Sequence, residues 1–187
     1  MLENSEFFPV IETERLLLRQ LTFKDLQDVY EVFSKEEIMK YYGIFPLEDI
    51  EEVEELIVDF NRGFEKNTSI RWGIELKSSK KIIGTIGYHN FNNRFLRAEM
   101  GYELSNKYWH EGYMKEAINA VLYFGFNHMN LNRVEALVYP ENIVSRSLLK
   151  ALSFREEGLL REYAYFRGQY EDLIMYSLLR REILEMN

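Results

Sequence analysis

The sequence contains no cysteine. It therefore cannot form a disulfide framework, ligate zinc or an iron–sulfur cluster through thiolates, or use a thiol nucleophile. Histidine is also scarce, and the three residues His89, His110 and His128 are scattered, which argues against a histidine-rich metal site. Three prolines and ten glycines leave no stretch that resembles an interdomain linker. We therefore predict one domain that covers residues 1–187.

Long apolar runs are missing as well. No segment approaches the ~20 apolar residues that cross a bilayer, and residues 1–6 lack the basic and apolar regions of a secretory signal. These absences predict a cytoplasmic protein without a membrane partner. The net charge of −8 argues against direct binding to nucleic acid, because the phosphate backbone attracts basic proteins.

The charge is unevenly distributed along the chain. Residues 1–66 hold 17 acidic and 7 basic residues, whereas residues 67–187 hold 14 acidic and 16 basic residues. This asymmetry is compatible with a cationic partner near the N-terminal third and an anionic partner elsewhere. It is equally compatible with a solvated acidic helix, such as the stretch of residues 48–59.

The residues that are present are typical of a folded globular protein. Hydrophobic residues make up 47% of the chain, and 13 Phe with 13 Tyr exclude intrinsic disorder. Apolar patterns predict strands at residues 15–19, 70–76, 81–88, 97–104, 133–138, 154–165 and 170–179. Helical spacing predicts helices after the N-cap Thr22 and over residues 47–64, 113–128 and 142–152. This order predicts an α+β, or mixed α/β, fold with helices packed on a sheet.

Two strand-to-helix junctions carry the residues of chemical interest. In the stretch 98–117, a strand passes through a loop with Gly112 into a helix. Free N–H groups at a helix N-terminus bind phosphate oxygens, and glycine allows the main chain to approach an anion, although a simple turn glycine explains the pattern too. About thirty residues later, Asn142 precedes another helix, where it is a natural N-cap.

Together, in this order and spacing, these stretches resemble the GNAT acetyltransferase superfamily, and within it the RimJ/RimL-like branch that acetylates protein N-terminal amines. Further matches are Thr13–Arg19, Ile83–Tyr88, Arg161–Glu162 and Tyr176–Leu179, so the resemblance covers residues 11–182. It implies a mostly antiparallel, twisted sheet of about seven strands, with a splay between strands 4 and 5 and about four flanking helices. It also implies acetyl-CoA as the cosubstrate and no metal.

The resemblance implies that the strand 97–104 and the following loop hold acetyl-CoA. Tyr102, Glu103 and Leu104 match positions whose main chain pairs with the pantetheine arm. The family's pyrophosphate loop reads Gln/Arg-x-x-Gly-x-Gly/Ala, often with Trp first in this branch, and here it matches Trp109, His110, Glu111, Gly112, Tyr113 and Met114. His110 and Met114 replace smaller residues, and we expect Met114 to narrow the phosphate site. The neighbouring Lys115 either adds positive charge or is simply solvated.

The same resemblance implies residues near the reacting thioester. Asn142 matches the family residue that contacts the cofactor arm there. Many family members use a tyrosine of the following helix to protonate the leaving thiolate, but Leu149 occupies that position. The branch suggests Ser145 as the replacement; alternatively, Ser145 hydrogen-bonds only the backbone.

Acetylation requires a neutral amine nucleophile. At pH 7, about one-tenth of an α-amine is neutral, compared with far below 1% of a lysine amine. The resemblance implies Glu99 as a half-buried base with a raised pKa; alternatively, Glu99 is a surface glutamate of an alternating strand. His89, at the end of the third predicted strand, is either a rival base or a hydrogen-bonded structural histidine. Backbone N–H groups on the splayed strand can stabilise the oxyanion. Tyr163 and Tyr165 either wall the acceptor pocket or serve as core or interface aromatics.

We therefore predict an acetyl-CoA-dependent N-acetyltransferase that acts on a primary amine by direct attack in a ternary complex. The favoured acceptor is a peptide or protein N-terminal α-amine. A small amine such as a polyamine, amino acid or aminoglycoside is the alternative acceptor. A non-catalytic acyl-CoA-binding module and a purely structural protein are the alternatives from other classes. The sequence leaves a monomer and a homodimer equally open.

Overall fold

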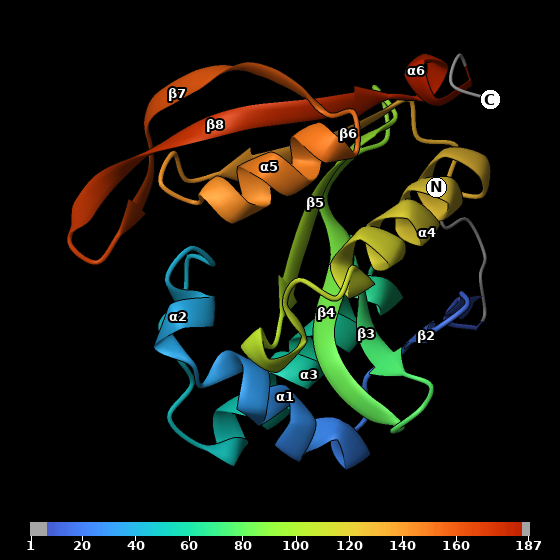
Figure 1. Ribbon diagram of the computed structural model, residues 1–187, viewed down its shortest axis with the longest axis vertical. Helices are drawn as coiled ribbons and strands as arrows, with labels where there is room; N and C mark the ends of the chain where they lie inside the picture. Colours follow the sequence, from blue (N-terminus) through green and yellow to red (C-terminus); the bar gives the residue numbers. More distant parts are fainter. Residues whose placement is uncertain (1–6, 185–187) are drawn as a thin grey trace.

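The computed structural model describes residues 7–184 and is built around one eight-stranded sheet (Figure 1). Residues 1–6, which lack the pattern of a secretory signal, lie outside the described residues. The strands follow the spatial order β1-β2-β3-β4-β5-β6-β8-β7, and all neighbours are antiparallel except β5 and β6. They are β1 (Ile11–Glu12), β2 (Leu16–Arg19), β3 (Ile70–Leu76), β4 (Lys81–Asn92), β5 (Arg97–Leu104), β6 (Arg133–Val138), β7 (Arg155–Phe166) and β8 (Gln169–Leu179).

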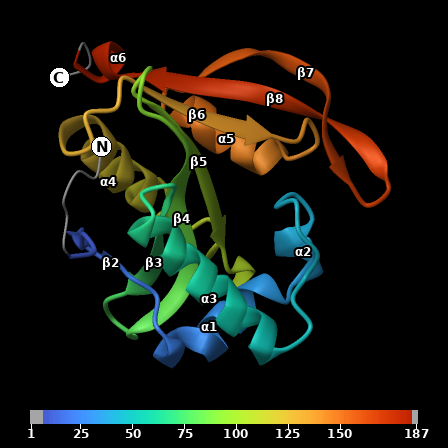
Figure 2. The same cartoon turned by 180° about the vertical axis from the view of Figure 1, so that it is seen from behind.

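The described residues also form six α-helices, which cover both faces of the sheet. α3 lies behind the sheet in Figure 1 and in front of it in Figure 2, whereas α4 and α5 lie on the opposite face. No helix within residues 7–184 has both the length and the apolar character needed to cross a membrane. The helices are α1 (Leu26–Phe33), α2 (Glu36–Met39), α3 (Ile50–Glu65), α4 (Tyr113–Asn127), α5 (Ile143–Ala151) and α6 (Arg180–Leu184).

The predicted mixed α/β fold is confirmed, and β3, β5 and β6 have the predicted bounds. The structure adds β1, α2 and α6, so the described chain has eight strands and six helices rather than about seven and about four. These added elements have two to five residues, which is too short to display a period of 2 or 3.6. The fold class is unaffected, because the added pieces lie at the edges of the predicted elements.

The N-terminal helices start where the sequence provides caps. Thr22 and Asp25 form a capping box before α1, and the Asp49 side chain accepts a hydrogen bond from the Glu52 amide at the start of α3. Val53 of α3 is buried, whereas its acidic residues are mostly exposed. The acidic stretch is therefore the solvated face of an amphipathic helix.

Two apolar clusters fix the helices to the sheet. The larger cluster contains the fully buried Trp72, Tyr88 and Tyr176 together with the apolar face of α4. The smaller cluster joins α1 and α3 to the sheet around Val29 and Phe33. Burying one large apolar side chain contributes about 1.5–3 kcal/mol. The packed clusters thus hold the strands in place on either side of the gap between β5 and β6.

The predicted splay between the strands 97–104 and 133–138 is confirmed. β5 and β6 pair only from Arg97 to Glu99, opposite Arg133 to Glu135, and they separate beyond that point. Ion pairs clamp the closed end: Arg97 donates to both oxygens of the buried Glu135, at 2.9 and 2.7 Å, and Arg133 donates to the same carboxylate at 2.7 Å. The pairing and the clamp together place the opening of the sheet at a fixed point, directly after Glu99.

Candidate active site

Two cavities meet where β5 and β6 separate. The first, which we call the α3-side cavity, has a volume of 490 Å³ and is lined by Phe60 of α3 and by residues of β3, β4 and β5. The second, the α4-side cavity, has a volume of 610 Å³ and lies at the N-terminal ends of α4 and α5. The residues that line both cavities form the junction between them: Tyr41, Tyr42, Tyr102, Asn142 and Ser145.

The start of α4 offers unused backbone donors to the α4-side cavity. Gly112 is the N-cap residue and adopts a left-handed conformation with φ 79°, which glycine reaches without steric cost. The first helical hydrogen bond runs from the amide of Glu116 to the carbonyl of Gly112. The three preceding amides, from Tyr113 to Lys115, therefore lie at the open helix end, where they suit an anion.

Most of the predicted pyrophosphate loop lines this cavity, with Glu111 as the exception. The Glu111 side chain is exposed, and its carbonyl accepts a hydrogen bond from Arg15 at 2.9 Å. Arg15 also pairs with Glu116 at 2.7 Å and lies 4.3 Å from the ring centre of Tyr113. Arg15 thus fixes the loop and the first turn of α4 together, a role that sequence analysis missed.

The two unusual loop residues are accommodated differently. His110 has φ 66°, so a histidine holds the left-handed conformation that glycine prefers. Met114 is only 7% exposed and packs into the larger core cluster. Met114 also lines the α4-side cavity, so the narrowing of the phosphate site by this residue stays a prediction. The Lys115 side chain is exposed.

Tyr102, Glu103 and Leu104 line the α4-side cavity, as predicted for the pantetheine strand. Their edge toward β6 is unpaired, since pairing with β6 stops at Glu99. The Leu104 carbonyl is already engaged, because it accepts a hydrogen bond from the Trp109 indole at 2.9 Å. The Glu103 side chain does not serve the α4-side cavity; it forms a buried ion pair with Arg71 on the α3 side.

The junction holds the predicted Asn142 and Ser145. The Asn142 side chain accepts a hydrogen bond from the Ser145 amide at 3.1 Å, so it caps α5 while also lining both cavities. The hydroxyl oxygens of Ser145 and Tyr102 lie 2.7 Å apart, which overturns the alternative that Ser145 bonds only the backbone. Burial raises the pKa of Tyr102 to about 12, so this phenol is neutral at physiological pH. Leu149 is fully buried in the core.

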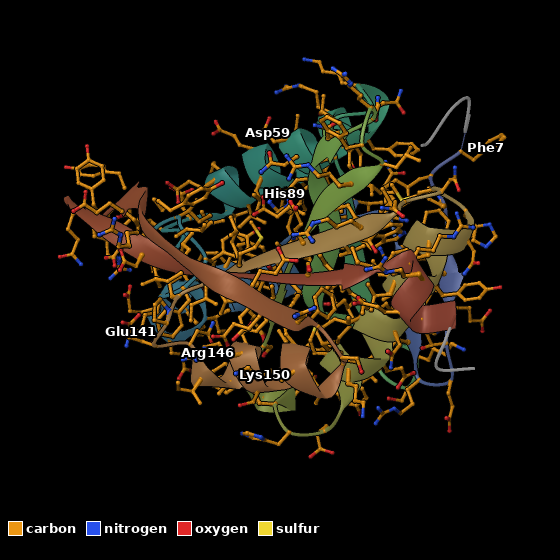
Figure 3. All side chains as sticks on the ribbon, turned by 90° about the horizontal axis from the view of Figure 1, so that it is seen from above. Phe7, Asp59, His89, Glu141, Arg146 and Lys150 are labelled. Carbon is orange, nitrogen blue, oxygen red and sulfur yellow. The ribbon has the colours of Figure 1, made fainter. Side chains whose placement is uncertain are left out.

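Glu99 and His89 lie together in the α3-side cavity. His89 Nε2 lies 3.4 Å from Glu99 Oε1, and the Asn90 side-chain Nδ2 donates to Glu99 Oε2 at 2.9 Å. Burial raises the pKa of Glu99, but the hydrogen bonds from His89 and Asn90 outweigh it, so the pKa lies below its usual value. The expected raised pKa is therefore wrong in direction. Figure 3 shows His89 on the same side of the sheet as Asp59 of α3.

A buried arginine that sequence analysis missed completes this cavity. Arg71 of β3 is 7% exposed and donates hydrogen bonds to Thr85, to the Gly101 carbonyl and to Glu103. Burial raises the pKa of Glu103 against the opposing effect of Arg71. The signal in the sequence was a charged residue near the start of a mostly apolar strand, in which Glu75 is the second charged residue.

Tyr163 and Tyr165 had two alternatives, walls of the acceptor pocket or core or interface aromatics. Both are exposed, at 56% and 65%, and neither lines the α3-side or the α4-side cavity, which argues against pocket walls and against core residues. The intervening Ala164 lines the α3-side cavity instead, because alternate residues of β7 face opposite sides. The aromatic wall comes from Tyr41 and Tyr139, whose ring centres lie 5.7 Å apart.

Comparisons with known proteins agree with this geometry. Residues 15–155 match the family described as "Acetyltransferase (GNAT) domain". The chain belongs to the GNAT acetyltransferase family. It is 39% identical over 173 residues to the uncharacterized N-acetyltransferase YoaA of Bacillus subtilis, with 92% of this chain and 98% of that protein covered. The chain is therefore an N-acetyltransferase, as predicted.

Two further GNAT proteins bear on the acceptor. The putative ribosomal N-acetyltransferase YdaF of Bacillus subtilis is 31% identical, with 69% of each chain covered. The crystal structure of spermidine N-acetyltransferase from Vibrio cholerae, in complex with CoA and spermine, has a TM-score of 0.79 at 27% identity and covers 92% of this chain and 99% of that chain. The predicted likeness to ribosomal-protein acetyltransferases is confirmed, and a polyamine enzyme is similar too.

This GNAT enzyme uses acetyl-CoA as its cosubstrate, and the α4-side cavity suits it. The open amides at α4 and the left-handed Gly112 fit a pyrophosphate, while Arg15 holds the loop in place. The unpaired edge of β5 fits an amide-containing arm that leads to the junction. The acetyl thioester would supply the electrophile. Residues of this chain would position the thioester and transfer the protons.

Proposed function

We propose that this enzyme acetylates the N-terminal α-amine of a peptide or protein, by direct attack on acetyl-CoA in a ternary complex. The observation that carries the proposal is the charge of the α3-side cavity. Among the described residues that line it, Glu99 is the single carboxylate. One carboxylate suits one ammonium group, whereas a polyamine carries several charges that each require compensation.

The proposed division of labour follows from the two cavities. Acetyl-CoA occupies the α4-side cavity, with its pyrophosphate on the loop of residues 109–115 and its arm along the main chain of residues 102–104. Asn142 lies beside the thioester end of the arm. The acceptor amine enters from the α3-side cavity, so nucleophile and thioester meet at the junction.

Glu99 and His89 together remove the proton from the acceptor. Glu99 is ionised at neutral pH, because its pKa is lowered, and it therefore attracts the ammonium group. The proton leaves through the Glu99–His89 pair, and the 42% exposure of the His89 side chain gives that pair access to solvent. The neutral amine then attacks the thioester carbonyl.

Collapse of the tetrahedral intermediate breaks the carbon–sulfur bond. The new carbon–nitrogen bond remains. The nitrogen gave up one proton before the attack and gives up a second after it, and the thiolate gains one as it leaves, so one proton is released in total. We assign Ser145 as the hydrogen-bond donor to the thiolate, supported by Tyr102, which holds the Ser145 hydroxyl at 2.7 Å. Amide groups on the open edge of β5 stabilise the oxyanion.

A panel of acceptors tests the proposal. Short peptides with free N-termini, the same peptides with a blocked N-terminus, spermidine and free amino acids would be compared with acetyl-CoA as donor. We expect free N-termini to show at least tenfold higher kcat/KM than spermidine, and mass spectrometry to locate the acetyl group on the α-amine. Preferential turnover of spermidine would overturn the proposal and would assign the enzyme to the polyamine class.

A further inference from the structure

Arg71 lies in a trough that two facing glycines create in the sheet. Gly87 of β4 and Gly101 of β5 are register partners. A Cβ atom at Gly87 would lie 2.8 Å from Arg71 Cδ, and one at Gly101 would lie 3.1 Å from Arg71 Nη1. A side chain at Gly87 would also collide with the Ile70 carbonyl, whereas one at Gly101 would shift the guanidinium itself. The two glycines thus make room for the Arg71 side chain, which lines the α3-side cavity.

The guanidinium retains hydrogen-bonding capacity after its internal contacts are made. Nε donates to Thr85 Oγ1 at 2.7 Å, Nη1 donates to the Gly101 carbonyl at 2.9 Å, and Nη2 donates to the Glu103 carboxylate. A guanidinium has five N–H donors, so one hydrogen on each Nη atom is left over. No residue in the described range 7–184 accepts either hydrogen.

The surroundings of Arg71 leave its side chain accessible from the α3-side cavity. The ring centres of Tyr42 and Phe60 lie 5.6 and 5.5 Å from its Cζ atom, and all three residues line the α3-side cavity. Glu103 neutralises the arginine charge, so the guanidinium does not repel an incoming ammonium group. What Arg71 offers the cavity is therefore an oriented pair of donors with little net charge.

Arg71 also lies next to the proposed base. A Cβ atom at Gly101 would contact Arg71 Nη1 at 3.1 Å and His89 Cε1 at 3.4 Å, so the two side chains meet above this glycine. His89 in turn lies 3.4 Å from Glu99. Glu99, His89 and Arg71 thus follow one another along the same face of the sheet.

We propose that Arg71 binds the carbonyl oxygen adjacent to the acceptor amine and makes the enzyme specific for α-amino acyl groups. The inference rests on the proposed function and deepens it. In an N-terminal residue, one α-carbon separates the amine from the carbonyl group. Glu99 can therefore hold the amine while Arg71 donates to the oxygen. A polyamine or a lysine side chain has no such oxygen and leaves the buried donors unmatched.

The wild-type enzyme provides the first test, because it involves no change to the fold. Alanine N-methylamide and isopropylamine both carry a primary amine on a methyl-substituted carbon, but only the first has the carbonyl group. Their kcat/KM values would be compared after correction for the fraction of neutral amine, measured over a pH series. We expect a preference of about 10- to 100-fold for the amide. Equal values would overturn the inference.

Two variants test whether Arg71 is the source of that preference. Gly101→Ala keeps the Arg71–Glu103 pair but pushes Nη1 aside, and the double variant Arg71→Gln/Glu103→Gln removes both buried charges together. Arg71→Gln alone would leave Glu103 buried without a partner and could prevent folding. We expect the preference for the amide to fall to about 2-fold or less in each variant. A purely structural role would instead lower both activities and preserve their ratio.

The controls separate this inference from the proposed function. Arg62→Gln, on the exposed face of α3, should keep the wild-type preference. Calorimetric titration with acetyl-CoA should give unchanged affinity in every variant. If the peptides are acetylated but the preference survives in the variants, the Arg71 inference fails alone. If spermidine is the better acceptor of the wild-type enzyme, the proposed function fails first.

Discussion

The two halves of β5 each carry one glutamate, Glu99 and Glu103, but have different surroundings. From Arg97 to Glu99 the strand is paired with β6, and Glu135 bridges two arginines across the closed end. From Gly101 to Leu104 that edge is open, and cavities lie on both sides of it. Charged residues fix the geometry in the closed half. The open half uses that fixed geometry to keep backbone and side-chain donors available for substrates.

The largest effect is expected in a residue at the boundary of the two halves. Glu99→Gln should lower kcat/KM by about 10²- to 10⁴-fold, because the cavity loses the group that attracts the ammonium and helps remove its proton. Thermal stability should change little. The matched control Glu54→Gln, on the exposed face of α3, should retain full activity. Steady-state kinetics would check both, and full activity of Glu99→Gln would contradict the assignment.

The pH profile sharpens this prediction. The pKa of Glu99 lies below its usual value of 4.5, so Glu99 is already ionised above pH 5. Any rise of kcat/KM between pH 6 and 8 must then come from another group, such as the acceptor amine. We expect Glu99→Gln to lower the whole profile while leaving the position of this rise unchanged. A shift of the rise by a full pH unit would show that Glu99 titrates there.

A variant that removes the ion pairs around Glu135 tests the half of β5 that is paired with β6. Glu135→Ala removes the shared partner of Arg97 and Arg133 and should destabilise the protein by about 2–4 kcal/mol. We expect activity at low temperature to fall as well, because the point of separation is no longer fixed. Urea denaturation would measure the loss, with the exposed ion-pair variant Asp59→Ala as a control that should cost about 1 kcal/mol or less.

Removing the hydroxyl group of Ser145 or of Tyr102 should have a smaller effect. Ser145→Ala should lower kcat by about 10- to 100-fold, because the thiolate loses its proposed hydrogen-bond donor. Tyr102→Phe should lower kcat less, by about 3- to 10-fold, since Ser145 remains in place. Ser147→Ala, an exposed position on the same helix, should have no effect. Single-turnover kinetics would detect these changes, and unaltered rates in Ser145→Ala would leave the thiolate without an assigned donor.

Removing backbone strain from the loop after β5 should raise the stability of the protein slightly. His110 holds φ 66°, a conformation that costs a non-glycine residue about 1–2 kcal/mol. Glycine removes this strain but adds about 0.4–1 kcal/mol of unfolded-state entropy. His110→Gly should therefore raise stability by up to about 1.6 kcal/mol without weakening acetyl-CoA binding. Thermal melting with and without acetyl-CoA would show whether the histidine has a function that offsets its strain.

The smallest effect is expected at Glu157, the second carboxylate that pairs with Arg133. Hydrogen bonds from Arg133 lower the pKa of Glu157 to about 2, below its usual 4.5. The stabilisation is therefore present above pH 4.5 and is lost as the pH falls toward 2. Glu157→Gln should reduce stability by about 1 kcal/mol or less at pH 6, and the difference from wild type should shrink at pH 3. A difference that is independent of pH would rule out this linkage.

Sequence analysis predicted those parts of the molecule that depend on local patterns. The strand bounds 70–76, 97–104 and 133–138 follow from apolar patterning, and Thr22 and Asn142 are the caps that their residue types predict. The resemblance to the GNAT superfamily pointed to the loop around Gly112 and to the region around Ser145. All of these features depend on residues that are close together in the chain.

The errors concern interactions between distant segments. The pKa of Glu99 depends on His89, a cross-strand neighbour, so its direction could not be read from the strand alone. Arg71 contacts Gly101 and Glu103, thirty or more positions away, and only the sheet register brings them together.

The two tryptophans of this chain lie in opposite environments, and this gives the enzyme a built-in optical reporter. Trp72 is fully buried in the core, so its emission should stay constant when a substrate binds. Trp109 is 39% exposed, lines the α4-side cavity and is tethered to the last residue of β5. Occupation of that cavity should change the emission of Trp109 alone. Fluorescence can therefore follow the cosubstrate in real time, without a label and without turnover.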